Sequence, residues 1–180
     1  MLGMVFTELL QMVEQQHSFA VADRIVERAG ARGAYTSVGY YPDSELMALV
    51  EALSAETGTP VPELLRAYGR HLLGCFRAGF PAFFDEAPTA EIFLERLESH
   101  VHAEVRKLYA TARPPVFELV RTPQGELVLD YVSSRGLADF AEGLLEGVLE
   151  HYRVDPTGLR REDLSGGVGT HVRFRLPRLA

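Results

Sequence analysis

Two histidines that stand two residues apart, His100 and His102, are the first candidates for metal binding in this sequence. A neutral imidazole is a common metal ligand. Both fall within residues 91–113, the most strongly helical stretch of the chain. Because a helix turns about 100° per residue, the two rings lie on opposite flanks of its apolar face and cannot share one ligand. Histidines at such a border are more often boundary residues than ligands, and periodicity alone does not separate these two.

A second group of candidate residues lies in the strand-like segment 127–135. Alternate residues of a strand share a face, so Tyr131, Ser133 and Arg135 are presented side by side. Two hydroxyls and a guanidinium can hold a carboxylate or a phosphate, since arginine pairs with such groups through two parallel hydrogen bonds. The alternative is a strand that leaves the core and exposes its polar end to solvent. Spacing alone favours that alternative.

The helix that carries the histidines is predicted by its ends as well as by its periodicity. Thr89 is a plausible N-cap, Glu91 lies in the first turn, and Pro114 with Pro115 ends the helix. Its apolar stripe consists of Leu94, Leu97, Val101, Val105 and Leu108. Glu95 and Glu98 are expected on a solvated face.

The remaining pattern predicts one α+β domain over residues 1–180, with a helical part over 1–60 and helices plus an antiparallel sheet over 61–180. Helices are expected over residues 2–16, 20–28, 43–57, 60–80 and 137–152. Strands are expected over residues 116–121, 126–134, 154–160 and 171–176. Gly166, Gly167 and Gly169 are expected to form a turn.

Composition narrows the class of protein. An apolar fraction of 47% suffices for a substantial core, and the net charge of −7 argues against nucleic acid or an anionic membrane as partner. No apolar run approaches a membrane span, and the acidic N-terminal segment is unlike a signal peptide, so we expect a cytoplasmic protein. The single cysteine, Cys75, excludes an internal disulfide and any CxxC or CxxCH motif.

Other chemical signatures are weak. The sequence contains no GxGxxG after a strand, no GxxxxGK[ST], no HExxH and no GxSxG. Cys75 lies in an apolar helix and is expected to be a small buried residue rather than a nucleophile. The other histidines are expected to lack ligand-spaced partners: His17, His71, His151 and His171.

Taken together, these segments resemble the haem–nitric oxide/oxygen binding (H-NOX) domain, the bacterial relative of the haem domain of soluble guanylate cyclase. The resemblance rests on HVHAEVRKLY, PPVFE, YVSSR and FAEGLLEG, and it extends to GMVFTELLQMVE and GAYTSVGYYPDSEL. It covers nearly the whole chain. It implies the H-NOX fold, with a helical N-terminal subdomain, a C-terminal antiparallel four-stranded sheet with packed helices, and haem between them.

The resemblance also implies one non-covalent haem b per chain. His102, and not His100, matches the proximal ligand of the haem iron. Tyr131, Ser133 and Arg135 match the trio that binds the haem propionates, which is the role that the strand face suggested. Pro115 matches a proline that packs against the haem and distorts it. The absence of CxxCH agrees with haem held without thioether links.

The gas that such a domain binds depends on the distal side of the haem. Oxygen-binding members place a tyrosine where this chain has Phe140, which lacks a hydroxyl donor. Tyr152, on the same helix, is expected to lie too far away to replace it. The resemblance therefore implies a nitric oxide sensor, able also to take carbon monoxide, in which stable oxygen binding is disfavoured. The other distal positions are matched by Val5, Leu9, Gly74, Ala78 and Leu144.

The family mechanism is a switch rather than a reaction, in which the bond to His102 weakens and the two parts of the domain shift. We expect no enzyme activity, and a signal passed to a separate histidine kinase or cyclic-di-GMP enzyme. Asp139 lies in the helix after the Tyr131–Ser133–Arg135 motif, and the chain has no cysteine beyond Cys75. No zinc site or thiol switch is therefore expected. The alternatives are an oxygen or redox sensor of the same family, a haem peroxidase-type enzyme, and a haem-free binding domain.

Overall fold

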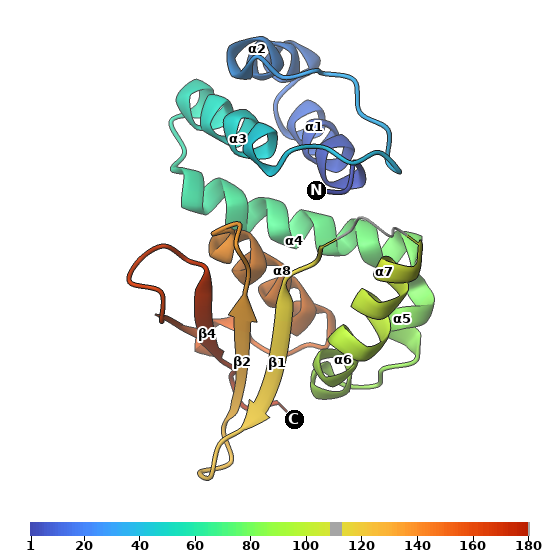
Figure 1. Ribbon diagram of the computed structural model, residues 1–180, viewed down its shortest axis with the longest axis vertical. Helices are drawn as coiled ribbons and strands as arrows, with labels where there is room; N and C mark the ends of the chain where they lie inside the picture. Colours follow the sequence, from blue (N-terminus) through green and yellow to red (C-terminus); the bar gives the residue numbers. More distant parts are fainter. Residues whose placement is uncertain (109–112, 180) are drawn as a thin grey trace.

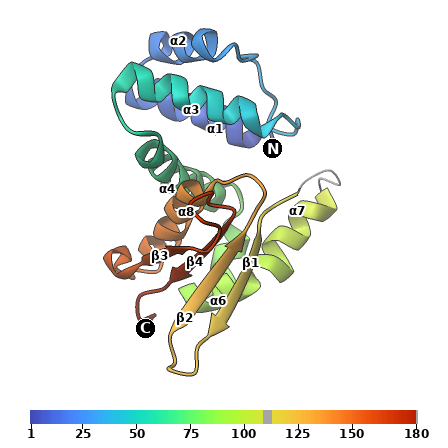
Figure 2. The same cartoon turned by 60° about the vertical axis from the view of Figure 1, so that its left-hand side comes forward.

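A computed structural model of the chain describes residues 1–108 and 113–179, and only the backbone of Leu108. Three N-terminal helices form a layer on one side of the long helix α4, and the sheet with its helices lies on the other (Figures 1 and 2). The expected α+β arrangement, helical with one four-stranded antiparallel sheet, is confirmed. Within the described ranges no helix is both long and apolar enough to cross a membrane.

The N-terminal layer consists of α1 (Met4–Gln16), α2 (Phe19–Ala29) and α3 (Asp43–Thr57). The hydroxyl of Ser18 accepts a hydrogen bond from the Val21 amide and caps α2. Gly30 ends α2 at a φ of 60°, in the left-handed region that glycine adopts without strain. The three helices enclose one hydrophobic core with α4, built around side chains such as Phe6 and Leu49 that are fully buried.

Helix α4 (Val61–Gly79) crosses α8 (Ala138–His151) at a point where both helices carry glycine. A Cβ atom on Gly69 would lie 2.3 Å from the backbone oxygen of Phe140, and one on Gly143 would lie 2.0 Å from that of Arg66. Only glycine permits such a close approach of two backbones. Because α4 contributes side chains to both hydrophobic cores, this crossing joins the helical layer to the sheet half.

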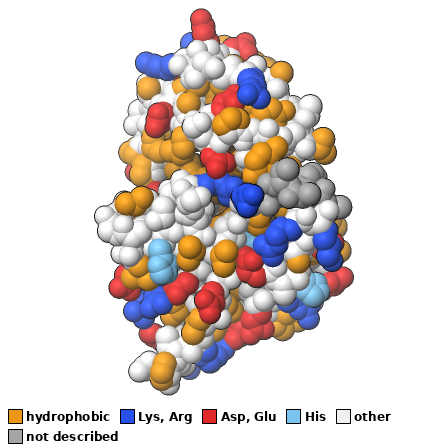
Figure 3. Space-filling view, viewed as in Figure 1, with side chains coloured by type: hydrophobic (Ala, Val, Ile, Leu, Met, Phe, Trp, Pro, Cys, Tyr) orange, Lys and Arg blue, Asp and Glu red, His pale blue; other side chains and the backbone are white. Residues whose placement is uncertain are grey.

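The sheet contains β1 (Val116–Arg121), β2 (Leu127–Val132), β4 (His171–Arg175) and β3 (Arg160–Asp163), in that spatial order and all antiparallel. In the register, Tyr131 on the central strand β2 lies opposite Phe117 on β1 and Val172 on β4. One face of the sheet packs on α8 and α6 around a second hydrophobic core. Acidic and basic side chains are interspersed over the face shown in Figure 3.

The strand expected over residues 154–160 is wrong. The short 3-10 helix η2 (Pro156–Gly158) occupies this segment, and β3 starts only at Arg160. Asp155 accepts a hydrogen bond from the Thr157 amide at 2.9 Å, and Pro156 has no N–H to give to a strand partner, so the chain turns here. The true strand reads Arg-Arg-Glu-Asp and lies at the sheet edge, where apolar alternation is not required. The expected turn at Gly166, Gly167 and Gly169 is confirmed, and all three have positive φ.

The helix expected over residues 91–113 is interrupted. A short helix α5 (Pro81–Asp85) precedes it, and the stretch then divides into α6 (Ala90–Arg96), the π-helix η1 (Leu97–His102) and α7 (Ala103–Leu108). Thr89 caps α6 as expected, since its hydroxyl accepts from the Ile92 amide. Residues 109–112 of the prediction lie outside the described residues, and Arg113 is not helical.

Candidate functional site

A cavity of about 390 Å³ lies where the N-terminal helices, the α4–α8 crossing, the α6–η1–α7 stretch and the β1–β2 hairpin meet. Its walls are mainly apolar, with a few polar side chains at one end. This volume lies within the range of about 300–1,000 Å³ that is typical of small-molecule and cofactor sites. Most of the residues selected from the sequence line it.

His102 lines this cavity, whereas His100 is exposed on the other side of η1. The Nδ1 atom of His102 lies 2.6 Å from Oε1 of Glu98, which leaves Nε2 as the free ring nitrogen. Burial lowers the pKa of His102 and outweighs the opposing effect of the Glu98 carboxylate. The imidazole is therefore neutral near pH 7, which is the form that binds a metal.

Glu98 is not on a solvated face, contrary to the expectation from periodicity. Its Oε1 also accepts a hydrogen bond from the Phe117 amide at 3.1 Å, and the guanidinium of Arg106 lies 3.4 Å from Oε2. The carboxylate thus fastens His102 to strand β1 and to helix α7. Its spacing of four residues from His102 is the sequence signal that could have identified it.

Tyr131, Ser133 and Arg135 all line the polar end of the cavity, although β2 ends at Val132 and only Tyr131 lies on the strand itself. The guanidinium of Arg135 donates through Nε to Oδ2 of Asp43 at 2.7 Å and through Nη1 to the backbone oxygen of Arg113 at 2.6 Å. Partial burial opposes ionisation of Asp43, but the hydrogen bonds and charges of Arg135 and of the N-terminal ammonium together outweigh it, so the pKa of this carboxyl lies below its ordinary value. Sequence reasoning missed Asp43, because only the packing of α3 brings it to the strand.

The apolar wall formed by α1 and α8 contains three of the expected distal residues, Val5, Phe140 and Leu144. Pro115 lines the cavity too, next to β1. Three expected distal residues lie elsewhere, which corrects the prediction. Leu9 is buried in the N-terminal core, and Gly74 and Ala78 are exposed.

Helix geometry explains why Gly74 and Ala78 of α4 do not line the cavity. The face of α4 toward the cavity carries Leu72 and Phe76, four residues apart. Gly74 and Ala78 each follow one of these by two residues, which turns them by about 200° to the opposite face. A Cβ atom added at Gly74 would meet no atom within 4 Å.

Two tyrosine hydroxyls in this part of the molecule, those of Tyr68 and Tyr152, have backbone partners. Tyr68 packs against Phe140 with 5.3 Å between ring centroids, but its buried hydroxyl donates to the backbone oxygen of Val5. Tyr152 does not line the cavity, as expected, and its hydroxyl lies 3.4 Å from the backbone oxygen of Phe84. Tyr40 lines the cavity from a position where it is 43% exposed to solvent.

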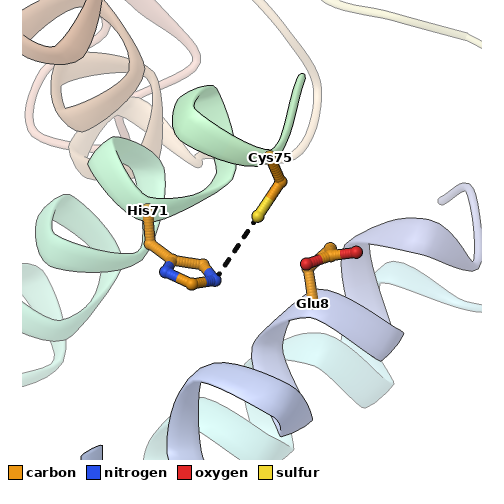
Figure 4. Close-up of side chains that lie close together, drawn as sticks. All are labelled: Glu8, His71 and Cys75. Atoms are coloured by element: carbon orange, nitrogen blue, oxygen red, sulfur yellow. Dashed lines mark hydrogen bonds between the residues drawn. The ribbon is translucent and has the colours of Figure 1, made fainter. Parts of the chain in front are cut away.

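A cluster outside the cavity corrects another expectation. His71 does have ligand-spaced partners: Cys75, four residues later on α4, lies with its Sγ 3.5 Å from Nε2 of His71, and Glu8 of α1 faces both (Figure 4). Burial and the neighbouring Glu8 carboxylate raise the pKa of Cys75 to about 12. Its thiol is therefore protonated near pH 7, which agrees with the expectation that it is not a nucleophile. The thiol is half-buried rather than enclosed.

The cavity has the donor set that a haem requires. A neutral imidazole faces an apolar volume, and hydroxyl and guanidinium donors are gathered at one end, where carboxylates could be held. Haem would be held by His102 at its iron and by Tyr131, Ser133 and Arg135 at its carboxylates. The residues present therefore fit the group.

Comparison with known proteins points the same way. A family model described as "Haem-NO-binding" matches residues 2–157. Soluble guanylate cyclase gcy-35 of Caenorhabditis elegans is 27% identical over 187 residues, which cover 97% of this chain and 27% of that protein. The chain thus spans about a quarter of the length of the curated relatives it matches.

Solved structures show the same fold. The H-NOX protein of Shewanella woodyi, in its IWP-051-bound Fe(II)CO state, is 35% identical, with a TM-score of 0.82 over 99% of this chain and 94% of that one. The Fe(II) unliganded H-NOX protein of K. algicida is 30% identical, with a TM-score of 0.85 over 98% and 95% of the two chains. H-NOX domains bind haem and act as gas sensors. This chain belongs to the Haem-NO-binding family.

Proposed function

We propose that this chain is a nitric oxide sensor that does not hold oxygen stably. The observation that carries the proposal is the apolar wall of Val5, Phe140 and Leu144. The hydroxyl of Tyr68, whose ring packs against Phe140, is already bound to the backbone oxygen of Val5. Haem b, held by His102, would supply an iron able to bind a diatomic gas. Hydrogen-bond donors on the distal side favour oxygen, whereas nitric oxide needs none.

On the proximal side, the chain supplies a neutral imidazole in a fixed orientation. Glu98 holds Nδ1 of His102, so Nε2 is the ring nitrogen free to bind iron. A carboxylate behind a metal-binding histidine fixes the tautomer and increases the basicity of the ligand. Phe117 packs beside the ring, with 5.8 Å between the centroids, and limits its rotation.

At the polar end of the cavity, Arg135 could bind a haem propionate in addition to Asp43 or in its place. It already binds the carboxylate of Asp43, and a propionate of haem would offer a second anionic group to the same guanidinium. The hydroxyls of Tyr131 and Ser133 lie beside it along the cavity. This arrangement supports propionate binding by the trio.

The signal originates in the stretch η1–α7, because it carries His102 and is held to the rest of the chain by polar contacts of Glu98. A gas that binds one arrangement of this stretch better than another shifts the population between the two. We infer that a separate protein reads the shift, either a histidine kinase or a cyclic-di-GMP enzyme, as the family resemblance implies.

The test of gas selectivity is exposure of the ferrous protein to air. The visible spectrum should show no reversible change with oxygen, but a large change with nitric oxide. Phe140→Tyr should create reversible oxygen binding, because it adds a hydroxyl to the apolar wall. Tyr40→Phe is the matched control and should change neither response. Reversible oxygen binding by the unchanged protein would refute the proposed selectivity.

The test of the iron ligand is the pair His102→Ala and His100→Ala. The first variant should lose haem during desalting, since it removes the proximal imidazole, and added free imidazole should restore the haem spectrum. The exposed His100 should be replaceable without effect. Normal haem spectra for His102→Ala without imidazole would show that another residue is the ligand.

A further inference from the structure

Three side chains with metal-binding atoms meet between α1 and α4, outside the haem cavity. Glu8 projects from α1, and His71 and Cys75 project from successive turns of α4 (Figure 4). Their ligand atoms, a carboxylate oxygen, an imidazole nitrogen and a thiol sulfur, all lie within 4.8 Å of one another. Each of the three residues is half-buried, so an ion could reach them from solvent.

The spacing of these ligand atoms resembles that of a tetrahedral metal centre. With Zn–S of about 2.3 Å and Zn–N of about 2.0–2.1 Å, a tetrahedral angle separates the sulfur from the nitrogen by roughly 3.6 Å. The Sγ of Cys75 and the Nε2 of His71 are 3.5 Å apart. Only a small further approach of the Glu8 carboxylate would complete a three-ligand set.

The types of ligand select the class of ion. Thiolate and imidazole together favour zinc and the neighbouring late transition metals over magnesium or calcium, which prefer all-oxygen sites. The Cys75 thiol is protonated in the free chain, so binding of the ion would release its proton to solvent. Three protein ligands leave the fourth tetrahedral position to water. We propose that Glu8, His71 and Cys75 form a binding site for one Zn²⁺-class ion. From the sequence we expected no zinc site, because the chain has no cysteine beyond Cys75, but a site of this kind needs only one cysteine.

The ion would join two helices that both contribute to the gas-binding cavity. Val5 lies one turn before Glu8 on α1, and Leu72 and Phe76 directly follow His71 and Cys75 on α4; all three line the cavity wall. A metal bridge would therefore fix the distance between α1 and α4 at this wall. Bound zinc should raise the unfolding temperature, because the site exists only in the folded chain.

The experiment uses haem-loaded protein stripped of other metals by a chelator. It is titrated with Zn²⁺ against a competing zinc dye, and the product is studied by X-ray absorption at the zinc edge. We expect one Zn²⁺ per chain, with one sulfur neighbour at about 2.3 Å and nitrogen or oxygen neighbours at about 2.0–2.1 Å. Zinc binding is measured without gas, so its failure would leave the proposed gas sensing untouched.

Three variants test the ligands: Cys75→Ser, His71→Ala and Glu8→Gln. Loss of outer-shell partners alone weakens metal affinity by about 10- to 100-fold, so Cys75→Ser and His71→Ala should weaken it by at least about 100-fold. His17→Ala removes an exposed histidine at the end of α1 and should have no effect. Circular dichroism confirms that each variant is folded. Absence of stoichiometric zinc, a zinc centre without sulfur, or affinity unchanged in Cys75→Ser would overturn the proposal and leave a weak hydrogen bond between His71 and Cys75.

Discussion

Two parts of the molecule border the same cavity but are held together in opposite ways. At the α4–α8 crossing, glycine backbones touch and α8 buries seven of its residues. The π-helix η1 buries none, and its main attachments are the hydrogen bonds of Glu98. Apolar packing is dense and resists displacement, whereas a few partly exposed polar contacts open at low cost. We therefore expect the α4–α8 crossing to stay in place and the η1–α7 stretch to be displaced more easily.

The largest effect that this comparison predicts is at the crossing. Gly69→Ala would place a Cβ atom 2.3 Å from a backbone oxygen of α8, which neither helix can relieve by moving a side chain. We expect a loss of about 3 kcal/mol or more in the free energy of unfolding. The measurement is urea unfolding followed by circular dichroism.

Gly74→Ala is the matched control in the same helix. A Cβ there meets open space, so the better helix propensity of alanine should stabilise the protein by about 0.5–1 kcal/mol. If the two alanine variants had equal stability, the backbone contact at the crossing would not be as close as described.

A smaller and more local effect is expected at Glu98. Glu98→Gln replaces a charged acceptor by a neutral one and weakens the bonds to His102 and the Phe117 amide. We expect a local cost of about 1–2 kcal/mol. It should appear as faster hydrogen exchange in η1 and α7, with exchange in α4 and α8 unchanged. Uniformly faster exchange throughout would mean that the stretch does not open independently.

The smallest effect concerns the ion pair between Asp43 of α3 and Arg135 in the turn after β2. Because the pKa of Asp43 is lowered in the folded protein, the unfolded chain takes up the proton first as the pH falls. The contribution of ionised Asp43 to the free energy of unfolding is therefore complete above the ordinary aspartate pKa of 3.8. It is lost as the pH falls through the lower pKa that Asp43 has in the folded protein.

This pair is partly exposed and screened by solvent, so its contribution is about 0.2–1 kcal/mol. Unfolding free energies measured between pH 5 and pH 3 should fall slightly more steeply for the unchanged protein than for Asp43→Asn. Parallel pH profiles would show that the interactions of ionised Asp43 with Arg135 and the N-terminal ammonium add nothing to stability.

Much of the fold could be predicted from local patterns. The helices over the first half and the β1–β2 hairpin follow from periodicity and from clear end signals such as Gly58 and Pro81. The edge strand β3 could not be predicted in this way, because its four residues are all charged and show no apolar alternation. The interruption of the central helix was also invisible, since a π-helix preserves an apolar stripe that reads as a continuous α-helix.

The site was predictable where its residues lie on one element and hidden where they come from two. Tyr131, Ser133 and Arg135 alternate at and just beyond the end of β2, so alternation was enough to group them. Asp43 and Glu8 approach their partners only through helix packing, which sequence spacing does not contain. The choice of His102 over His100 needed family resemblance. The structure gives it a physical basis, because one ring faces the cavity and the other faces water.

The π-helix η1 allows the η1–α7 stretch two backbone registers. Its hydrogen bonds span one residue more than those of an α-helix, so the turn that ends at His102 stores one residue of slack. Tightening that turn to α-helical pitch would pass the extra residue along the chain and rotate everything on one side of it by about 100°. Deleting one residue within this turn would leave only the α-helical register. His102 and Val105, which both line the cavity now, could then no longer both face it. A helix that contains such a π-helical turn can rotate by one residue, about 100°, without unfolding.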